Sequence, residues 1–420
     1  MSKPIPTPAC DEFDPNNLNV EPARERILSN VSVVAGVERV AIRDALDRIL
    51  AADIISPINV PPYANSAMDG YAVIASDLPP EGERSLKLLG TSFAGTPFDG
   101  HVGAGECVRI MTGAKMPSGA DSVIMQEHVR IEKDRIAIGP GHTAGQNVRH
   151  IGEDIGAGKP VLTAGKKIGP AELGLLASLG TPEVSVYRKL RVAFFSTGDE
   201  LRSVGEPLQE GQIYDSNRYT LFGMLRRLHV DVIDMGVIPD KREAVEQAFT
   251  DAAGIADAII TSGGVSVGEA DFVKETLQKL GTVEFWKINV KPGKPLAFGR
   301  VDKAVFFGLP GNPVSVMATF YQFALPALKV MCGESQTAPV IVKVPCKTLL
   351  KKRPGRTDFQ RGVLSYDEKG QLVVDGTGMQ ASHILSGMSQ ANCFIILPPE
   401  AGDIEAGTLV EVQPFAGLSS

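Results

Sequence analysis

The sequence has few residues of the types that carry redox or nucleophilic chemistry. Its 420 residues include only 5 cysteines, 6 histidines and 1 tryptophan. The cysteines are far apart and never form a Cys-x-x-Cys pair, which argues against a disulfide framework or a zinc site and is typical of a cytosolic protein. The sequence also has no His-x-x-x-His pair and no nucleophile–histidine constellation.

Features of membrane and nucleic-acid proteins are missing as well. The chain contains no apolar run of about 18 residues, and its N-terminus lacks the basic start and apolar core of a signal peptide. We therefore expect a cytoplasmic protein without membrane spans. The net charge is −7, which does not favour binding to nucleic acid or to an anionic membrane. An anionic substrate would need a local basic pocket.

The length predicts about three domains, and the pattern changes along the chain. Residues 1–19 contain four prolines and predict a flexible lead-in. Residues 22–52 have apolar positions at helical spacing. Residues 57–150 are rich in glycine, proline and short β-like runs, which predict a small mixed β domain. A further helix is expected to begin near Pro170, because proline suits the first helical turn.

Strands and helices alternate between residues 189 and 334. This pattern predicts a three-layer α/β domain with a largely parallel sheet, in which ligands collect at the carboxyl ends of the strands. Three motifs follow predicted strands: STGDE (196–200), TSGGVSVGEAD (261–271) and GLPGNP (308–313). Short strands over residues 335–420 predict a C-terminal β-barrel-like domain.

The segment VPPYANSAMDGYAV, residues 60–73, concentrates polar side chains in a loop. Two prolines impose an extended approach, and Asn65, Ser66 and Asp69 follow before Gly70. Such a loop is either a functional site or a turn capped by Asn65 and Asp69. The segment alone does not separate these two interpretations.

Carboxylates follow the first strand of the α/β region. Thr197, Asp199 and Glu200 lie directly after it, and a pair of carboxylates could bind Mg²⁺ through oxygen. The alternative for Asp199 is that it caps a short helix.

A glycine-rich turn follows a second strand. Gly263, Gly264 and Ser266 would let backbone N–H groups approach a phosphate, unless the turn merely joins a strand to a helix. Asp271 either caps that helix or reaches a metal ion or a ribose.

Basic and capping residues complete the inventory. KPGKP places Lys291 and Lys294 on a stiff turn that could clamp an anion. Asn312 and Pro313 are expected to start a helix whose N-terminus attracts anions. PGRTDFQRG carries Arg356 and Arg361, of a residue type that pairs with oxyanions. Ser382 and His383 give a weaker signal.

Nine motifs occur in order: NSAMDGYAV, RIMTGA, GEDI, STGDEL, GQIYDSN, TSGGVSVGEAD, KPGKP, GLPGNPVS and PGRTDFQRG. Together they resemble the MoeA-type molybdopterin molybdenumtransferases, which are similar to the C-terminal domain of gephyrin. The match runs from about residue 20 to the C-terminus. In the related adenylyltransferase the Gly-Gly loop continues to Arg-Asp, whereas here it reads Gly-Glu-Ala-Asp, which favours the transferase.

The resemblance implies an enzyme of molybdenum cofactor biosynthesis that inserts molybdate into adenylylated molybdopterin and releases AMP, with Mg²⁺ as cofactor. It implies elongated homodimers whose active site is shared between subunits. Possible partners are the pathway adenylyltransferase and apo-molybdoenzymes. The implied domains are a discontinuous linking and dimerisation domain (20–56 and 151–188), a small β domain (57–150), a catalytic α/β domain (189–334) and a C-terminal β domain (335–420). The alternatives are a non-enzymatic gephyrin-like scaffold and a molybdopterin-storage module.

The resemblance also implies roles for individual residues. The implied catalytic residues are Asp69, Glu200, Asp271, Lys291 and Lys294. The implied metal ligands are Asp69, Glu200, Asp240 and Asp271. The substrate would be bound by Thr112, Asp154, Thr197, Gly263, Gly264, Ser266, Asn312, Ser315, Arg356 and Ser382. Of these, Asp69, Thr112 and Asp154 would come from the partner chain.

Overall fold

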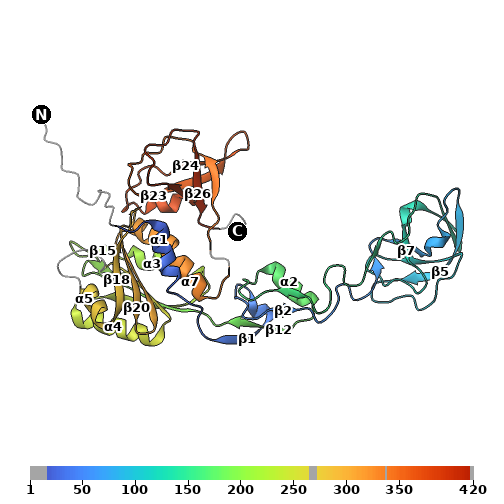
Figure 1. Ribbon diagram of the computed structural model, residues 1–420, viewed down its shortest axis with the longest axis horizontal. Coiled ribbons are helices and arrows are strands. Elements are labelled where there is room, and N and C mark those ends of the chain that lie inside the picture. Colours follow the sequence, from blue (N-terminus) through green and yellow to red (C-terminus); the bar gives the residue numbers. More distant parts are fainter. Residues whose placement is uncertain (1–16, 264–271, 336–337, 417–420) are drawn as a thin grey trace.

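The structure is a computed structural model that describes residues 17–263, 272–335 and 338–416. It is elongated (Figure 1). An α/β unit and a C-terminal β unit lie together at one end, a small β unit lies at the other end, and a slender linking region joins the two ends. The architecture is therefore multidomain, with mixed α/β and sheet-rich parts.

A six-stranded sheet forms the centre of the α/β unit, in the order β16-β13-β17-β21-β20-β18. Four neighbouring strands are parallel, as the alternating pattern predicts: β16 (Asp231–Ile238), β13 (Arg191–Thr197), β17 (Ala258–Ser262) and β21 (Ala304–Leu309). The sequence analysis missed β20 (Pro295–Val301), which pairs antiparallel with β21 and with β18 (Gly281–Lys287). The sheet is thus mixed at one edge, because a tight hairpin replaces a helical crossover there.

Helices cover both faces of this sheet. One face packs on α1 (Val20–Leu28), α3 (Ser216–Arg226) and α6 (Pro313–Thr319), and the other on α4 (Arg242–Ile255) and α5 (Phe272–Leu280). Alternate residues of β13 enter the two cores: Val192 and Phe194 join one, and Ala193 and Phe195 join the other. This period of two is what a strand buried on both faces requires, and it produces the predicted three layers.

The helix over Pro313–Met331 is apolar and long enough to cross a membrane, but 78% of its most apolar window is buried inside the protein. It is a core helix made of α6, a π-helical turn η5 (Phe320–Ala324) and α7 (Leu325–Met331). Pro326 has no N–H to donate to the carbonyl of Gln322, and Arg24 Nε donates to that carbonyl instead, at 3.2 Å. Gln322 Nε2 also donates to Gln413 Oε1 at 2.7 Å. One glutamine therefore connects α1, the core helix and the C-terminal unit.

The linking region consists of short pairs of strands and one helix. β1 (Val37–Ala41) pairs with β12 (Glu183–Tyr187), β2 (Ile54–Ile55) pairs with β11 (Pro160–Leu162), and α2 spans Pro170–Ser178. The helix expected near Pro170 is confirmed. The expectation of helix throughout 22–52 is wrong beyond α1, because pairing with β12 draws residues 37–41 into a strand and leaves only a short 3-10 helix at Ile42–Ala45.

Residues 17–19, at the end of the predicted lead-in, pair with the α/β unit. The Leu18 N–H donates to the Lys287 carbonyl at 3.1 Å, and the Asn289 N–H donates to the Leu18 carbonyl at 2.8 Å. These two hydrogen bonds fix the start of the described chain beside β18.

The small β unit contains a six-stranded sheet in the order β7-β4-β6-β5-β9-β8. These strands are β4 (Gly70–Val73), β5 (Arg84–Ser92), β6 (Glu106–Ile110), β7 (Ser122–Met125), β8 (Val129–Glu132) and β9 (Arg135–Ile138). Beside the sheet, β3 (Asn65–Ser66) pairs with β10 (Val148–Arg149). A Cβ at Gly70 would clash with the carbonyl oxygen of Ile124, so β4 lies against β7 only because residue 70 is glycine.

The C-terminal unit contains a third six-stranded sheet, in which β23 (Thr357–Tyr366) pairs with β24 (Leu372–Gly376) and with β25 (Cys393–Leu397). β25 continues through β26 (Leu409–Pro414) to β22 (Val342–Pro345), and α8 spans Ser386–Gln390. Its other edge strand, β19 (Val290–Lys291), belongs to the chain of the α/β unit. The sheet therefore crosses the boundary between the two units.

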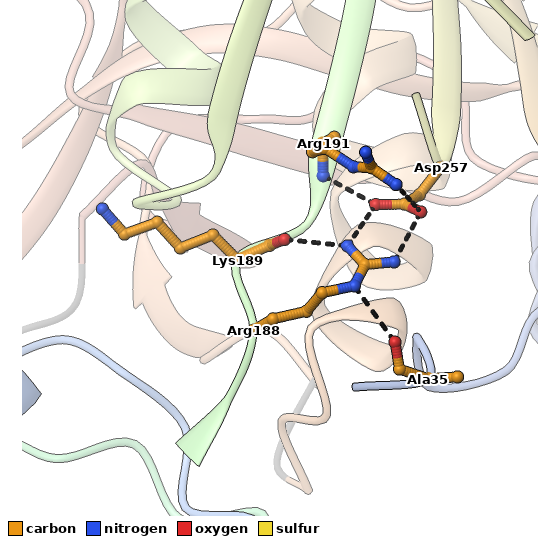
Figure 2. A network of polar contacts seen from close by, with 5 residues as sticks. All are labelled: Ala35, Arg188, Lys189, Arg191 and Asp257. Atoms are coloured by element: carbon orange, nitrogen blue, oxygen red, sulfur yellow. Dashed lines mark hydrogen bonds and ion pairs between the residues drawn. The ribbon is translucent and has the colours of Figure 1, made fainter. Parts of the chain in front are cut away.

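Arg188 and Asp257 connect the linking region to the α/β unit (Figure 2). Arg188 Nη1 and Nη2 each donate to one carboxylate oxygen of Asp257 at 2.7 Å. Arg188 Nε donates to the carbonyl of Ala35 at 3.0 Å, and the N–H of Arg191 donates to Asp257 at 2.9 Å. Both connecting segments, near residues 35 and 188, are thus attached to one carboxylate. We call Arg188 and Asp257 the clamp.

We predict that Asp257→Asn lowers the free energy of unfolding of the α/β unit by about 2 kcal/mol. The cost is below that of a fully buried pair because the two side chains remain 25% and 14% exposed. Burial raises the pKa of Asp257, but hydrogen bonds from Arg188 and Arg191 outweigh it, and the pKa lies below its usual value.

The lowered pKa of Asp257 fixes the pH dependence of this contribution. The stability gained from ionised Asp257 is present above the unfolded pKa, near pH 4, and is lost as pH falls through the folded pKa. Denaturant unfolding from pH 8 to pH 3 should show a constant difference between wild type and Asp257→Asn above about pH 4 and a shrinking one below it. Asp251→Asn, on α4, is the control and should match the wild type; a pH-independent difference for Asp257→Asn would contradict the prediction.

Candidate functional site

The carboxyl ends of three parallel strands lie side by side. Ser196 on β13 pairs with Ser262 on β17, which in turn pairs with Leu309 on β21. The N–H of Gly263 donates to the Leu309 carbonyl at 3.2 Å, and Gly263 has a φ of +89°. A Cβ at position 263 would stand 3.0 Å from the Thr197 carbonyl oxygen. Thr197 and Gly263, both predicted to bind substrate, are therefore in contact.

Asn217 is a residue of this edge that the sequence analysis missed. Its Nδ2 donates to Ser262 Oγ at 2.8 Å and to the Gly311 carbonyl at 2.7 Å, so it connects two of the loops. Asn217 lies in the first turn of α3, where Asp215 is the N-cap and accepts from the N–H of Arg218 at 3.1 Å. The segment DSN looks like a helix start, and capping alone accounts for its polar residues. The bridging role had no separate signal in the sequence.

Three carboxylates gather after β13 and β16. The N–H of Asp240 donates to Asp199 Oδ1 at 3.2 Å, so Asp199 joins two loops rather than capping a helix. Burial raises the pKa of Asp240, and the nearby negative charges of Asp199 and Glu200 raise it further. A Cβ at Gly198 would lie 2.6 Å from Glu200 Oε2, so the glycine leaves room for the glutamate to fold back. Within the described ranges, no three potential ligands converge into a complete metal centre.

The KPGKP turn packs against α6. Gly293 has a φ of +107°, and a Cβ there would lie 2.5 Å from Thr319 Oγ1 and 3.5 Å from the Ser315 carbonyl oxygen. The turn is closed by a 2.8 Å hydrogen bond from the N–H of Ile288 to the carbonyl of Lys294. The structure therefore brings the loop of Lys291 and Lys294 next to buried Ser315.

The loop that contains Ser382 covers the start of α6. The N–H of Val314 donates to the Ser382 carbonyl at 3.1 Å. Asn312 occupies the N-cap position, as predicted, but its side chain makes no capping hydrogen bond. One N–H of the helix N-terminus is thus already used, and the anion site predicted there has fewer free donors than the sequence suggested.

The two arginines of PGRTDFQRG have different environments. Arg356 precedes β23, which pairs with β19 through Lys291 and Asp358, so Arg356 lies near the KPGKP turn. Arg361 is 1% exposed and donates to the carbonyls of Met379 and Ala381. The interpretation of Arg361 as an oxyanion ligand is wrong, because its guanidinium is used to hold the loop that carries Ser382.

Asp69 and Thr112 meet in the small β unit. Asp69 Oδ1 accepts hydrogen bonds from the N–H and the Oγ1 of Thr112, both at 2.7 Å. Hydrogen bonds from the Thr112 backbone and then from its side chain lower the pKa of Asp69, so the exposed carboxylate is ionised at neutral pH. The 60–73 loop therefore presents an ionised carboxylate that also holds the backbone and side chain of Thr112.

Asp154 is exposed as well. Its N–H donates to the Val60 carbonyl, at the start of the 60–73 loop, at 3.0 Å. The strands β5 and β7 of this unit lie at the opposite end of the molecule from β18 and β23 (Figure 1). The structure of one chain therefore does not bring Asp69, Thr112 or Asp154 to the α/β edge. Three predicted site residues, Gly264, Ser266 and Asp271, lie outside the described residues.

Family comparisons cover nearly the whole chain. Residues 18–180 match the family described as MoeA N-terminal region (domain I and II). Residues 193–330 match a probable molybdopterin binding domain. Residues 343–415 match the MoeA C-terminal region (domain IV).

Individual relatives agree with this match. The molybdopterin molybdenumtransferase of Haemophilus influenzae is 48% identical over 96% of this chain and 99% of its own length. Gephyrin of Dictyostelium discoideum is 36% identical over 89% of this chain and 59% of its own length. The crystal structure of a molybdopterin biosynthesis moeA protein from Pyrococcus horikoshii superposes with a TM-score of 0.83 at 28% identity, covering 95% of this chain and 100% of that one. The chain therefore belongs to the molybdopterin molybdenumtransferase (MoeA) family of molybdenum cofactor biosynthesis.

Proposed function

We propose that this chain inserts molybdate into adenylylated molybdopterin and releases AMP. The observation that carries the proposal is the convergence of the KPGKP turn, Ser315 on α6 and the Ser382 loop at one end of the sheet. Lysine and serine side chains suit a tetrahedral oxyanion such as molybdate, because they supply positive charge and hydroxyl donors. The glycine turn at Gly263 suits the phosphate of the adenylyl group, since a backbone without Cβ allows close approach.

The carboxylates support a Mg²⁺ requirement. Glu200 and Asp240 are hard oxygen ligands, and the pKa of Asp240 is raised first by burial and then by the negative charges of Asp199 and Glu200. A divalent cation would offset the repulsion between these carboxylates. When bound, Mg²⁺ would neutralise negative charge on the phosphate oxygens of the substrate. Asp271, the other predicted ligand of this unit, lies outside the described residues.

We further propose that the active site is shared between two copies of the chain in a homodimer. Asp69 is ionised and exposed, yet it lies at the far end of its own chain from the lysines and Glu200. A second copy could supply this carboxylate, together with Thr112 and Asp154, to the α/β edge. In this arrangement the units would be those expected from the sequence: 20–56 with 151–188, 57–150, 189–334 and 335–420.

The enzyme is favoured over the two alternatives. A gephyrin-like scaffold or a storage module would not need Asp69, Glu200, Lys291 and Lys294, and all four are present. We expect a cytoplasmic enzyme, in keeping with the four cysteines of the described ranges, Cys107, Cys332, Cys346 and Cys393, which are unpaired.

We predict that Asp69→Asn and Lys294→Ala each lower molybdate-dependent AMP release by roughly 100-fold or more. Each change removes one charge while leaving the surrounding backbone in place. The measurement is AMP formed from adenylylated molybdopterin in the presence of Mg²⁺ and molybdate. The matched controls are Asp99→Asn in the small β unit and Lys303→Ala in the β20–β21 turn, both at exposed positions. Wild-type rates for Asp69→Asn and Lys294→Ala, with folded protein, would refute the proposed activity.

Mg²⁺ dependence provides a separate prediction. Asp240→Asn should raise the Mg²⁺ concentration for half-maximal AMP release by about tenfold, because one anionic oxygen ligand is lost. The measurement is a Mg²⁺ titration at fixed molybdate and substrate, with Asp251→Asn as the control carboxylate. Identical Mg²⁺ curves for Asp240→Asn and the control would show that this carboxylate group does not hold the metal.

A further inference from the structure

A buried carboxylate lies among cations where the α/β and C-terminal units meet. Asp358 on β23 is 4% exposed, and its carboxylate accepts a 3.1 Å hydrogen bond from Gln360 Nε2. Burial raises the pKa of Asp358 above its usual value, and the hydrogen bond from Gln360 and the charges of Lys291, Lys352 and Arg356 offset only part of that rise. A carboxylate at this depth is costly unless such positive charges compensate it.

Strand pairing places these groups close together. Lys291 on β19 is the pairing partner of Asp358 on β23, and the two strands are parallel. Paired residues of neighbouring strands extend to the same face of a sheet. Arg356 directly precedes Thr357, which pairs with Val290 of β19, so the backbone of Arg356 lies beside the start of the same strand pair. The N–H of Thr357 donates to the Asn289 carbonyl at 3.0 Å, which fixes the register at the point where the units join.

Two other cations near Asp358 are already held by carbonyl groups. Lys352 is 5% exposed, and its Nζ donates to the carbonyls of Ala401 at 3.0 Å and Arg353 at 3.3 Å. Arg361 holds the Ser382 loop, as described above. The charged groups of Lys352 and Arg361 are therefore engaged by carbonyl groups of the protein rather than by a ligand. Lys291 and Arg356, both expected from the sequence to bind an anion, are the remaining cations of the group, and they come from different units.

We infer that Asp358 is a positioning residue whose buried carboxylate serves as the shared counter-charge of Lys291 and Arg356. Asp358 thereby holds Lys291 and Arg356, the two side chains that would bind the oxyanion, together across the junction between the units. This inference rests on the proposed function. It assigns to the reaction a residue that does not itself contact substrate, since a carboxylate in contact with molybdate would repel it.

The test is Asp358→Asn. Asparagine has nearly the same side-chain shape as aspartate, and its amide oxygen can still accept the hydrogen bond from Gln360. Removing the negative charge strengthens the attraction of the site for a dianion, so the KM for molybdate should fall roughly threefold or more. Lys291 and Arg356 lose their common counter-charge and are held less precisely, so kcat should fall about tenfold. A purely structural defect would instead lower kcat and raise KM or leave it unchanged, and that result would overturn the inference.

Two controls separate charge from folding. Glu411→Gln, an exposed residue of the same sheet that pairs with Lys343, changes the net charge equally and should leave both constants at their wild-type values. If Asp358→Asn does not fold, Asp358→Glu carries the test. It keeps the charge but moves it, so KM should stay within about twofold of wild type while kcat falls. An unchanged kcat for a folded Asp358 variant contradicts the inference.

Failure of the inference can be told apart from failure of the proposed function by including Lys294→Ala. If Lys294→Ala is inactive and Asp358→Asn behaves as wild type, only the positioning role is refuted. If Lys294→Ala retains wild-type molybdate-dependent AMP release, the proposed function itself is refuted.

Discussion

The clamp between Arg188 and Asp257 is the contact on which the geometry of the whole chain depends. Two segments, near residues 35 and 188, join the linking region to the α/β unit. Arg188 lies in the second segment, and it donates to the Ala35 carbonyl of the first and to Asp257, the residue before β17. A Cβ at Gly36 would lie 3.0 Å from Arg188 Cδ, so the glycine allows the second segment to approach. A charged bidentate pair is directional, and a small rotation here becomes a large displacement at the small β unit. The position of Asp69 relative to the α/β unit of its own chain is therefore set at this contact.

The α/β edge separates opposite charges by the order of its strands. Asp199, Glu200 and Asp240 follow β13 and β16 at one side of the sheet, whereas the KPGKP turn joins β18 to β20 at the other side. The glycine turn at Gly263 lies between them, directly after β17. This order places the carboxylates on one side of the turn and the lysines of KPGKP on the other. A substrate that carries a phosphate and receives an oxyanion matches that separation. The C-terminal unit meets the lysine side, because β19, which contains Lys291, is an edge strand of its sheet.

Local patterns predicted the parts of this fold that depend on local chemistry. Buried parallel strands, Pro170 and Pro313 at helix starts, and glycine turns at strand ends could all be read from the sequence. The strand at 37–41 could not, because its pairing with β12 involves residues about 150 positions away, and such pairing overrides helical spacing. Arg361 was misread for a related reason. Residue type indicates that an arginine can bind an oxyanion, but burial among the carbonyls of residues 379 and 381 follows only from tertiary packing. Asn217 was missed because capping already explained its segment.

The central claim is that Asp69 of one chain serves the α/β edge of another. Mixing Asp69→Asn and Lys294→Ala chains, with different affinity tags and purification of the mixed dimer, tests it most directly. In a shared arrangement, one of the two sites in the mixed dimer has both residues intact, so AMP release should recover to about half of the wild-type rate. Each homodimer made in parallel should stay inactive. A mixed dimer that remains as inactive as its two parents would place the whole site within one chain and contradict the account.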